Sequence, residues 1–171
     1  MSLVEPEDGV PPAVARQLQV IAFAMGAGLA LMAGLVFWAH HHAAAAVPSP
    51  AQVKSINALT AVMMGVALAL IVASELAWRF LLRGSARPLS GRLQAAFIAR
   101  LACREGAGLL GLTVAYIAAI SGVLRVYPAY WVNLAPFALF LVFLASHWPT
   151  EDRLAAEARD ALGENPSFLK K

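Results

Sequence analysis

The sequence predicts an all-α integral membrane protein, a bundle of four membrane-spanning helices with both termini in the cytoplasm. The first reason is composition. Of 171 residues, 60% are hydrophobic and 13% are charged, whereas soluble domains carry about 45–50% and 25%. The second is four long stretches without Asp, Glu, Lys or Arg, each able to hold the ~20 apolar residues of a membrane-crossing helix. The third is an uneven distribution of basic residues between the two predicted sides of the membrane.

The composition excludes several classes of protein. A chain with a mean hydropathy of +0.69 cannot hide its apolar surface in a soluble core of this size, which excludes a soluble enzyme and a disordered chain. The single cysteine, Cys103, allows no intrachain disulfide. The net charge of +3 is a topology signal in such a protein, so we expect no nucleic-acid partner.

We expect a transmembrane domain over 18–148, with spans at about 18–39, 56–78, 105–124 and 130–148. A tryptophan falls at one end of each span, where indole rings favour the headgroup level; the four are Trp38, Trp78, Trp131 and Trp148. The first stretch, followed by the small residues 43–46, also fits a cleavable secretory signal. Because it is longer than a typical signal-peptide core, we interpret it as an uncleaved span.

The basic residues assign the orientation of the spans. Eleven of the thirteen lie in the N-terminal segment, between spans two and three, or after span four; they are Arg16, Arg79, Arg83, Arg87, Arg92, Arg100, Arg104, Arg153, Arg159, Lys170 and Lys171. Only Lys54 and Arg125 fall on the other side. Because cytoplasmic loops carry the excess of Lys and Arg, we expect a multi-pass protein of the bacterial inner (cytoplasmic) membrane with both termini inside.

The two ends of the chain are predicted to lie outside the membrane. Residues 1–17 form an acidic, Pro-rich disordered tail and the start of the first helix, which Pro12 is suited to open. Residues 149–171 are expected to form a short cytoplasmic helix and a basic tail. Thr150 is the expected N-cap of this helix, which runs to Leu162 before Gly163 ends it.

The inner connection predicts an amphipathic helix that leads into span three. From Gly91 to Leu124 nothing interrupts a helix, which would measure about 51 Å against a hydrocarbon core of ~30 Å. Its first part must therefore project from the membrane or lie along its surface, and we expect an interfacial amphipathic helix with Ser90 as N-cap, in which Gly106 and Gly108 are the positions that permit bends. Its basic face predicts contacts with anionic lipid headgroups; that face consists of Arg92, Arg100 and Arg104.

Small residues spaced by four predict close packing of spans one to three, because helices in lipid associate by close approach. The predicted packing positions are Gly26, Ala30, Gly34, Gly65, Ala69, Ala107, Gly111 and Ala115. Span four has bulkier side chains and a possible kink at Pro136. We expect a tight three-helix core with span four on its flank or facing a partner.

Charged residues gather near the predicted cytoplasmic boundary. The cluster consists of Glu75, Arg79, Arg100, Arg104, Glu105 and His147. An ionised group at this depth is costly unless it is paired, and Arg104 or Arg100 is the natural partner of Glu75. One interpretation is an ion-pair clamp that fixes the register of spans two and three. The other is a proton or anion site.

Two segments resemble a known group of proteins. Arg100-Leu-Ala-Cys-Arg-Glu-Gly-Ala-Gly-Leu-Leu-Gly111 precedes an apolar span, and Pro149-Thr150-Glu151-Asp152-Arg153 follows the last one. This pattern resembles a group of small bacterial four-transmembrane-helix proteins to which no activity is assigned. The resemblance implies the order of the four spans and marks Glu105 as the acidic position of that group. It implies no activity.

The outer histidines are weak candidates for a metal site. Imidazole suits Zn²⁺, Cu²⁺ and Ni²⁺, but no Cys, Asp or Glu on that side completes a ligand set with His40, His41 and His42. We therefore expect neither a metal site nor a cofactor.

No sequence pattern points to catalysis. The chain contains no Ser-x-x-Lys, His-Glu-x-x-His, Gly-x-Ser-x-Gly or Walker motif. We expect a non-catalytic accessory, assembly or scaffolding subunit of a larger membrane complex, with the bilayer, anionic lipids and other membrane subunits as partners. The alternative is a small transporter or ion-conducting homo-oligomer that uses Glu75, Arg104 and Glu105.

Overall fold

Seven helical segments make up the computed structural model over the residues that it describes, 10–42, 47–83 and 88–162. They are α1 (Pro12–His42), α2 (Pro50–Arg83), α3 (Leu89–Ile120), α4 (Val123–Val126), the 3-10 helix η1 (Pro128–Leu134), α5 (Ala135–Ser146) and α6 (Glu151–Leu162). Four segments are long and apolar enough to cross a membrane: α1, α2, α3, and η1 together with α5. The prediction of an all-helical protein with four candidate spans is therefore confirmed.

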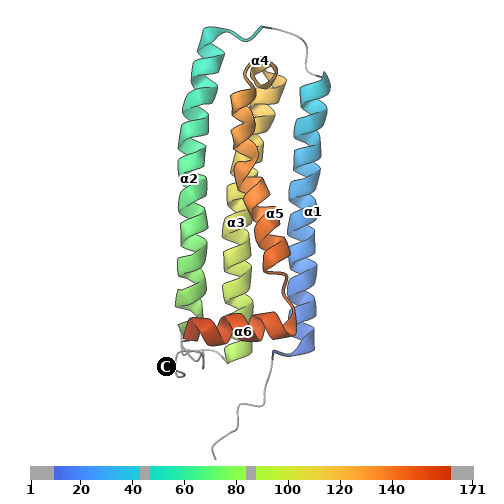
Figure 1. Ribbon diagram of the computed structural model, residues 1–171, viewed down its shortest axis with the longest axis vertical. Coiled ribbons are helices and arrows are strands. Elements are labelled where there is room, and N and C mark those ends of the chain that lie inside the picture. Colours follow the sequence, from blue (N-terminus) through green and yellow to red (C-terminus); the bar gives the residue numbers. More distant parts are fainter. Residues whose placement is uncertain (1–9, 43–46, 84–87, 163–171) are drawn as a thin grey trace, which may run out of the picture.

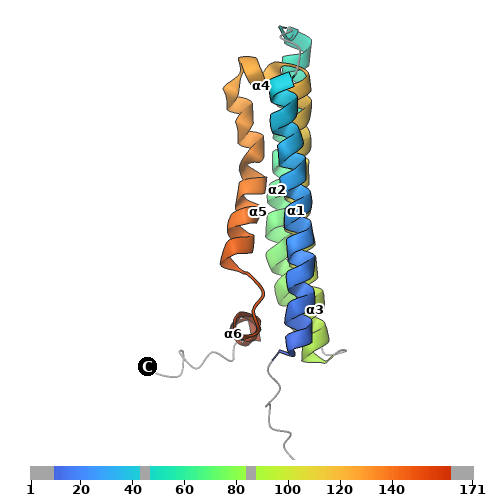
Figure 2. The same cartoon turned by 90° about the vertical axis from the view of Figure 1, so that its right-hand side faces the viewer.

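Helix α3 is the centre of the arrangement. It stands between α1 and α2, and α5 lies over it (Figure 1). After a quarter turn, α1, α2 and α3 overlap as one layer, and α5 lies to one side of that layer (Figure 2). The expectation is a tight three-helix core with span four on its flank; in the structure α1 and α2 each pack against α3, and α5 lies on one face of α3.

The outer sides of the long helices are apolar. Phe23, Leu31, Leu68 and Phe80 are exposed over 64–79% of their surface. A water-soluble monomer rarely exposes so much contiguous apolar surface. These faces suit contact with lipid.

The surface helix expected before span three is not found. Residues 91–104 are the first half of α3, which runs without interruption and upright beside α2 (Figure 1). The reason lies in α2, which continues to Arg83 and buries Trp78 and Leu82. The longer α2 gives Leu93 and Phe97 a partner to pack against, so both are buried.

The helix that crosses the end of the bundle is instead α6, which lies roughly perpendicular to the long helices (Figures 1 and 2). Its start agrees with the sequence: the backbone N–H of Arg153 donates to Thr150 Oγ1 at 3.4 Å. Gly163, its expected end, lies outside the described residues.

Other helix ends agree in part with the sequence. Helix α1 begins at Pro12 as expected, whereas α3 begins at Leu89, one residue before the expected cap. Gly122 adopts a positive φ of 75°, a conformation that favours glycine, and α3 ends at Ile120. In span four the 3-10 helix η1 gives way to α5 just before Pro136, and this proline lies in the first turn of α5, where its missing N–H costs nothing.

Four of the eight predicted packing positions are buried within the bundle, and the other four are not. Gly26, Ala107, Gly111 and Ala115 are buried, whereas Ala30, Gly34, Gly65 and Ala69 face outward. A spacing of four rotates about 40° per step on a helix of 3.6 residues per turn. The buried stripe of α1 combines spacings of three and four instead, through Ala15, Leu18, Ala22, Gly26, Leu29, Ala33 and Val36.

Candidate functional site

An ion-pair network joins α2, α3 and α6 at the α6 end of the bundle. Arg100 on α3 donates two hydrogen bonds to the Glu75 carboxylate on α2, from Nε and Nη2, both at 2.9 Å. Arg100 Nη1 donates to Glu157 Oε2 on α6 at 3.0 Å. Arg104, one turn along α3 and therefore on the same side of the helix, donates from Nη2 to Glu75 Oε1.

Aromatic rings cover the faces of both guanidinium groups. The Arg100 Cζ atom lies 5.2 Å from the Trp78 ring centre and 4.9 Å from that of Phe143. The Arg104 Cζ atom lies 4.1 Å from the Phe143 ring centre, and the His147 ring stacks on Phe143 at 4.6 Å. The Phe143 contacts bring α5 into the cluster, and the three guanidinium–ring contacts are of the kind that attracts a cation to a ring.

A polar cleft of about 450 Å³ opens beside the network. Its lining comes from α2, α3, α6 and the end of α5: Glu75, Trp78, Arg79, Arg83, Arg100, His147, Glu157 and Asp160. Arg79 and Arg83 are exposed, and among the described residues neither has a hydrogen bond or ion pair. The cleft therefore contains paired charges at its inner wall and two unengaged arginines on α2.

No protein-family model matches this chain. Neither a curated protein nor a solved structure matches it either.

The structure brings together most of the residues of the predicted boundary cluster, but not all. Glu75, Arg100 and Arg104 are bonded to one another, and His147 lies beside them. Glu105 does not join them: it is partly buried on α3, with no hydrogen bond or ion pair to another described residue.

Sequence reasoning missed Glu157 and the role of Phe143. A signal for Glu157 was present, because Leu154, Glu157 and Ala158 follow a spacing of three and four that puts them on one face of α6. Leu154 and Ala158 are 1% and 3% exposed, so this face is the one that packs against the bundle.

The arginines expected to contact lipid headgroups have other partners. Arg100 is 8% exposed, and its guanidinium is occupied by Glu75 and Glu157. Arg104 is held by Glu75, and Arg92 donates from Nη1 to the Leu82 carbonyl at 2.7 Å, near the end of α2. All three guanidinium groups thus serve contacts within the bundle.

The outer histidines belong to the last turn of α1. His42 Nδ1 lies 2.9 Å from the Trp38 carbonyl, and the His40 ring packs edge-on against Trp131. Among the described residues, no group of three or more His, Cys, Asp or Glu side chains is placed to hold a metal ion.

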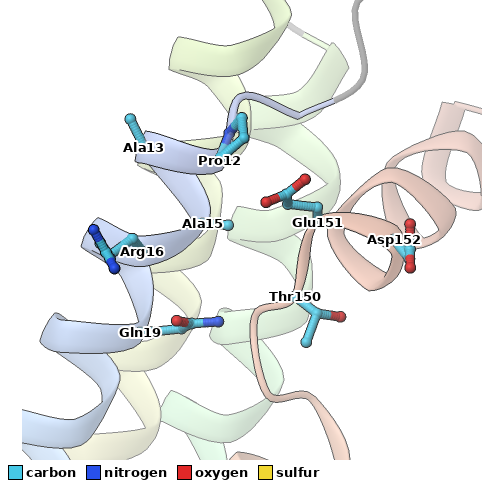
Figure 3. A pocket seen from close by; sticks show the side chains of 8 residues that line it. All are labelled: Pro12, Ala13, Ala15, Arg16, Gln19, Thr150, Glu151 and Asp152. Atoms are coloured by element: carbon cyan, nitrogen blue, oxygen red, sulfur yellow. The ribbon is translucent and has the colours of Figure 1, made fainter.

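A second cleft, of about 740 Å³, lies between the start of α1 and the start of α6. Figure 3 shows the first turns of α1 facing Thr150 and Glu151 across it. Gln19 Nε2 donates to the Pro149 carbonyl at 3.1 Å. This bond ties α1 to the segment that joins α5 and α6.

Proposed function

We propose that the protein is a non-catalytic integral membrane subunit that scaffolds or assembles a larger complex. The observation that carries the proposal is the network of Glu75, Arg100, Arg104 and Glu157. Its charged side chains form ion pairs that join α2, α3 and α6. A buried charge is tolerated in a bundle when it is paired and hydrogen-bonded. Such a clamp fixes the shape of a bundle whose outer faces remain apolar.

In this proposal the protein lies in the bacterial inner membrane with both termini in the cytoplasm, as the basic residues of the sequence indicate. The α6 end of the bundle then faces the cytoplasm. Extraction in mild detergent followed by native mass spectrometry should show a heteromeric complex. A homo-oligomer alone would favour the second candidate below.

The second candidate is a small transporter or ion-conducting homo-oligomer. Glu105 favours it, because an ionisable group inside a membrane helix is costly and often functional, and this one has no partner among the described residues. The polar cleft beside Glu75 would be the inner opening of such a path.

A double-mutant cycle separates the two candidates. Breaking a buried ion pair costs about 3–5 kcal/mol of unfolding free energy. The Glu75 side chain is 39% exposed, so we expect about 1–2 kcal/mol each for Glu75→Gln and Arg104→Gln by thermal unfolding in detergent. The double variant should regain part of the loss, because no charge is then left without its partner.

Glu105→Gln is the matched control, since this carboxylate has no partner to lose among the described residues. It should leave the unfolding temperature unchanged. Proton flux into liposomes gives the second measurement. If Glu75→Gln and Arg104→Gln keep full stability but abolish a proton flux that the unmodified protein supports, the transport candidate replaces the scaffold.

A further inference from the structure

Two arginines on α2 remain unengaged beside the polar cleft. Arg79 and Arg83 are four residues apart, so they lie about 6 Å apart along the same side of the helix. Both are exposed and line the cleft, and among the described residues neither has a hydrogen bond or ion pair. Two guanidinium groups at this spacing can contact one phosphate group from two sides.

The carboxylates of the cleft leave these arginines available. Glu75 is shared by Arg100 and Arg104, and Glu157 is bonded to Arg100. Asp160, also in the lining, has an interaction of its own. An anion that enters the cleft would therefore meet carboxylates that already have partners, together with two arginines that have no hydrogen bond or ion pair among the described residues.

The stripe of α2 that carries the two arginines is amphipathic along its length. Val72, Leu76, Arg79 and Arg83 follow one another at spacings of four, three and four, and so share one side of the helix. Val72 and Leu76 are 53% and 63% exposed. The apolar part lies toward the middle of the bundle and the basic part toward the α6 end. A phospholipid beside this stripe would place its acyl chain against the apolar part and its headgroup against the arginines.

We infer that the cleft between α2 and α6 binds a phosphate group, with Arg79 and Arg83 as the contacting residues, and that the phosphate belongs to the headgroup of an anionic phospholipid. The apolar stripe above the arginines favours a lipid over free phosphate. This site is independent of the scaffolding role. It also differs from the headgroup contacts expected at Arg92, Arg100 and Arg104, which are engaged within the bundle.

The test compares two double variants of the full chain in detergent. R79Q/R83Q removes the two arginines of the cleft. R153Q/R159Q removes two exposed arginines of α6, at the same end of the bundle but outside the cleft lining. Native mass spectrometry with added phosphatidylglycerol or phosphatidylcholine measures lipid affinity, and thermal unfolding with inorganic phosphate measures binding of the free anion.

We expect R79Q/R83Q to bind phosphatidylglycerol about thirty-fold more weakly than the unmodified protein, since each basic residue at an anionic surface strengthens binding roughly fivefold. R153Q/R159Q should stay within about twofold of it, because neither arginine lines the cleft and an exposed charge contributes little. R79K/R83K keeps both charges and should retain most of the affinity. This variant shows that substitution at the two positions does not by itself prevent folding. Protection by phosphatidylglycerol but not by inorganic phosphate supports the lipid as the source.

Equal protection by inorganic phosphate, lost in R79Q/R83Q, supports the phosphate site but assigns it to a soluble ligand. Unchanged phosphatidylglycerol binding in R79Q/R83Q overturns the proposal. An equal loss in R153Q/R159Q also overturns it, because the lipid would then respond only to total charge.

Discussion

Arg100 meets the requirements of a guanidinium group that is removed from water. Its side chain is 9% exposed, and all three of its nitrogens donate to carboxylates. The rings of Trp78 and Phe143 lie against the same group. A lysine ammonium could not bond two carboxylates in this flat, forked geometry, so the position depends on arginine itself.

Of the described glycines whose surroundings are known, Gly111 has the closest neighbour. A Cβ atom there would lie 2.2 Å from the Asn133 carbonyl oxygen, which belongs to the backbone of η1. We expect Gly111→Ala to lower the unfolding free energy in detergent by about 1–3 kcal/mol, the usual range for overpacking. Gly65→Ala is the control, because nothing lies within 4 Å of its added Cβ atom, and it should cause no loss. Equal effects of both substitutions would contradict the assignment of Gly111 to a helix contact.

At the scale of the helices, the sequence predicted what depends on local chemistry. The four long apolar segments, the start of α1 at Pro12 and the cap of α6 at Thr150 each follow from a few neighbouring residues. The direction of residues 91–104 does not, because it depends on how far α2 extends beside them. The same limit explains the missed bond between Arg100 and Glu157, which are 57 residues apart.

The small-residue pattern shows a different limit. Glycine and alanine permit close approach of two helices, but the sequence does not say which face of a helix has a neighbour. Gly26 faces Leu144 of α5, whereas Gly34 on the same helix has nothing within 4 Å of an added Cβ atom. Only the position of α5 separates these two cases.

Helix α6 packs on the bundle through a small apolar face and the ion pair of Glu157 with Arg100. Leu154 and Ala158 are buried, and Glu157 bonds Arg100. Glu157→Gln should weaken the attachment by about 1 kcal/mol, the value for a partly exposed pair. Local opening should then be about fivefold more frequent, and trypsin should cut after Arg153 and Arg159 correspondingly faster.

The control for this measurement is Ala156→Gln, which places the same side chain on the exposed side of α6. It should be cut at the rate of the unmodified protein. If both variants are cut equally fast, the ion pair does not hold α6 to the bundle.

The arrangement of the four candidate spans is asymmetric, because α5 lies on one side of the layer formed by α1, α2 and α3 (Figure 2). An even number of candidate spans brings the start of α1 and helix α6 to the same end of the bundle (Figure 1). The engaged charges of the network are also at this end. Among the described residues, the Lys and Arg residues of the opposite end are Lys54 and Arg125.

This distribution predicts the orientation of the protein in the membrane. Positively charged loops stay in the cytoplasm, so reporter fusions after Lys171 and within residues 84–90 should both read cytoplasmic. A fusion within residues 47–52 should read periplasmic. Replacing Lys54 with Gln serves as a control, because it enlarges the charge asymmetry and should leave all three results unchanged. A periplasmic reading after Lys171 together with a cytoplasmic reading within residues 84–90 would mean an odd number of crossings between these two points, and one of the two later candidate spans would then have to lie outside the bilayer.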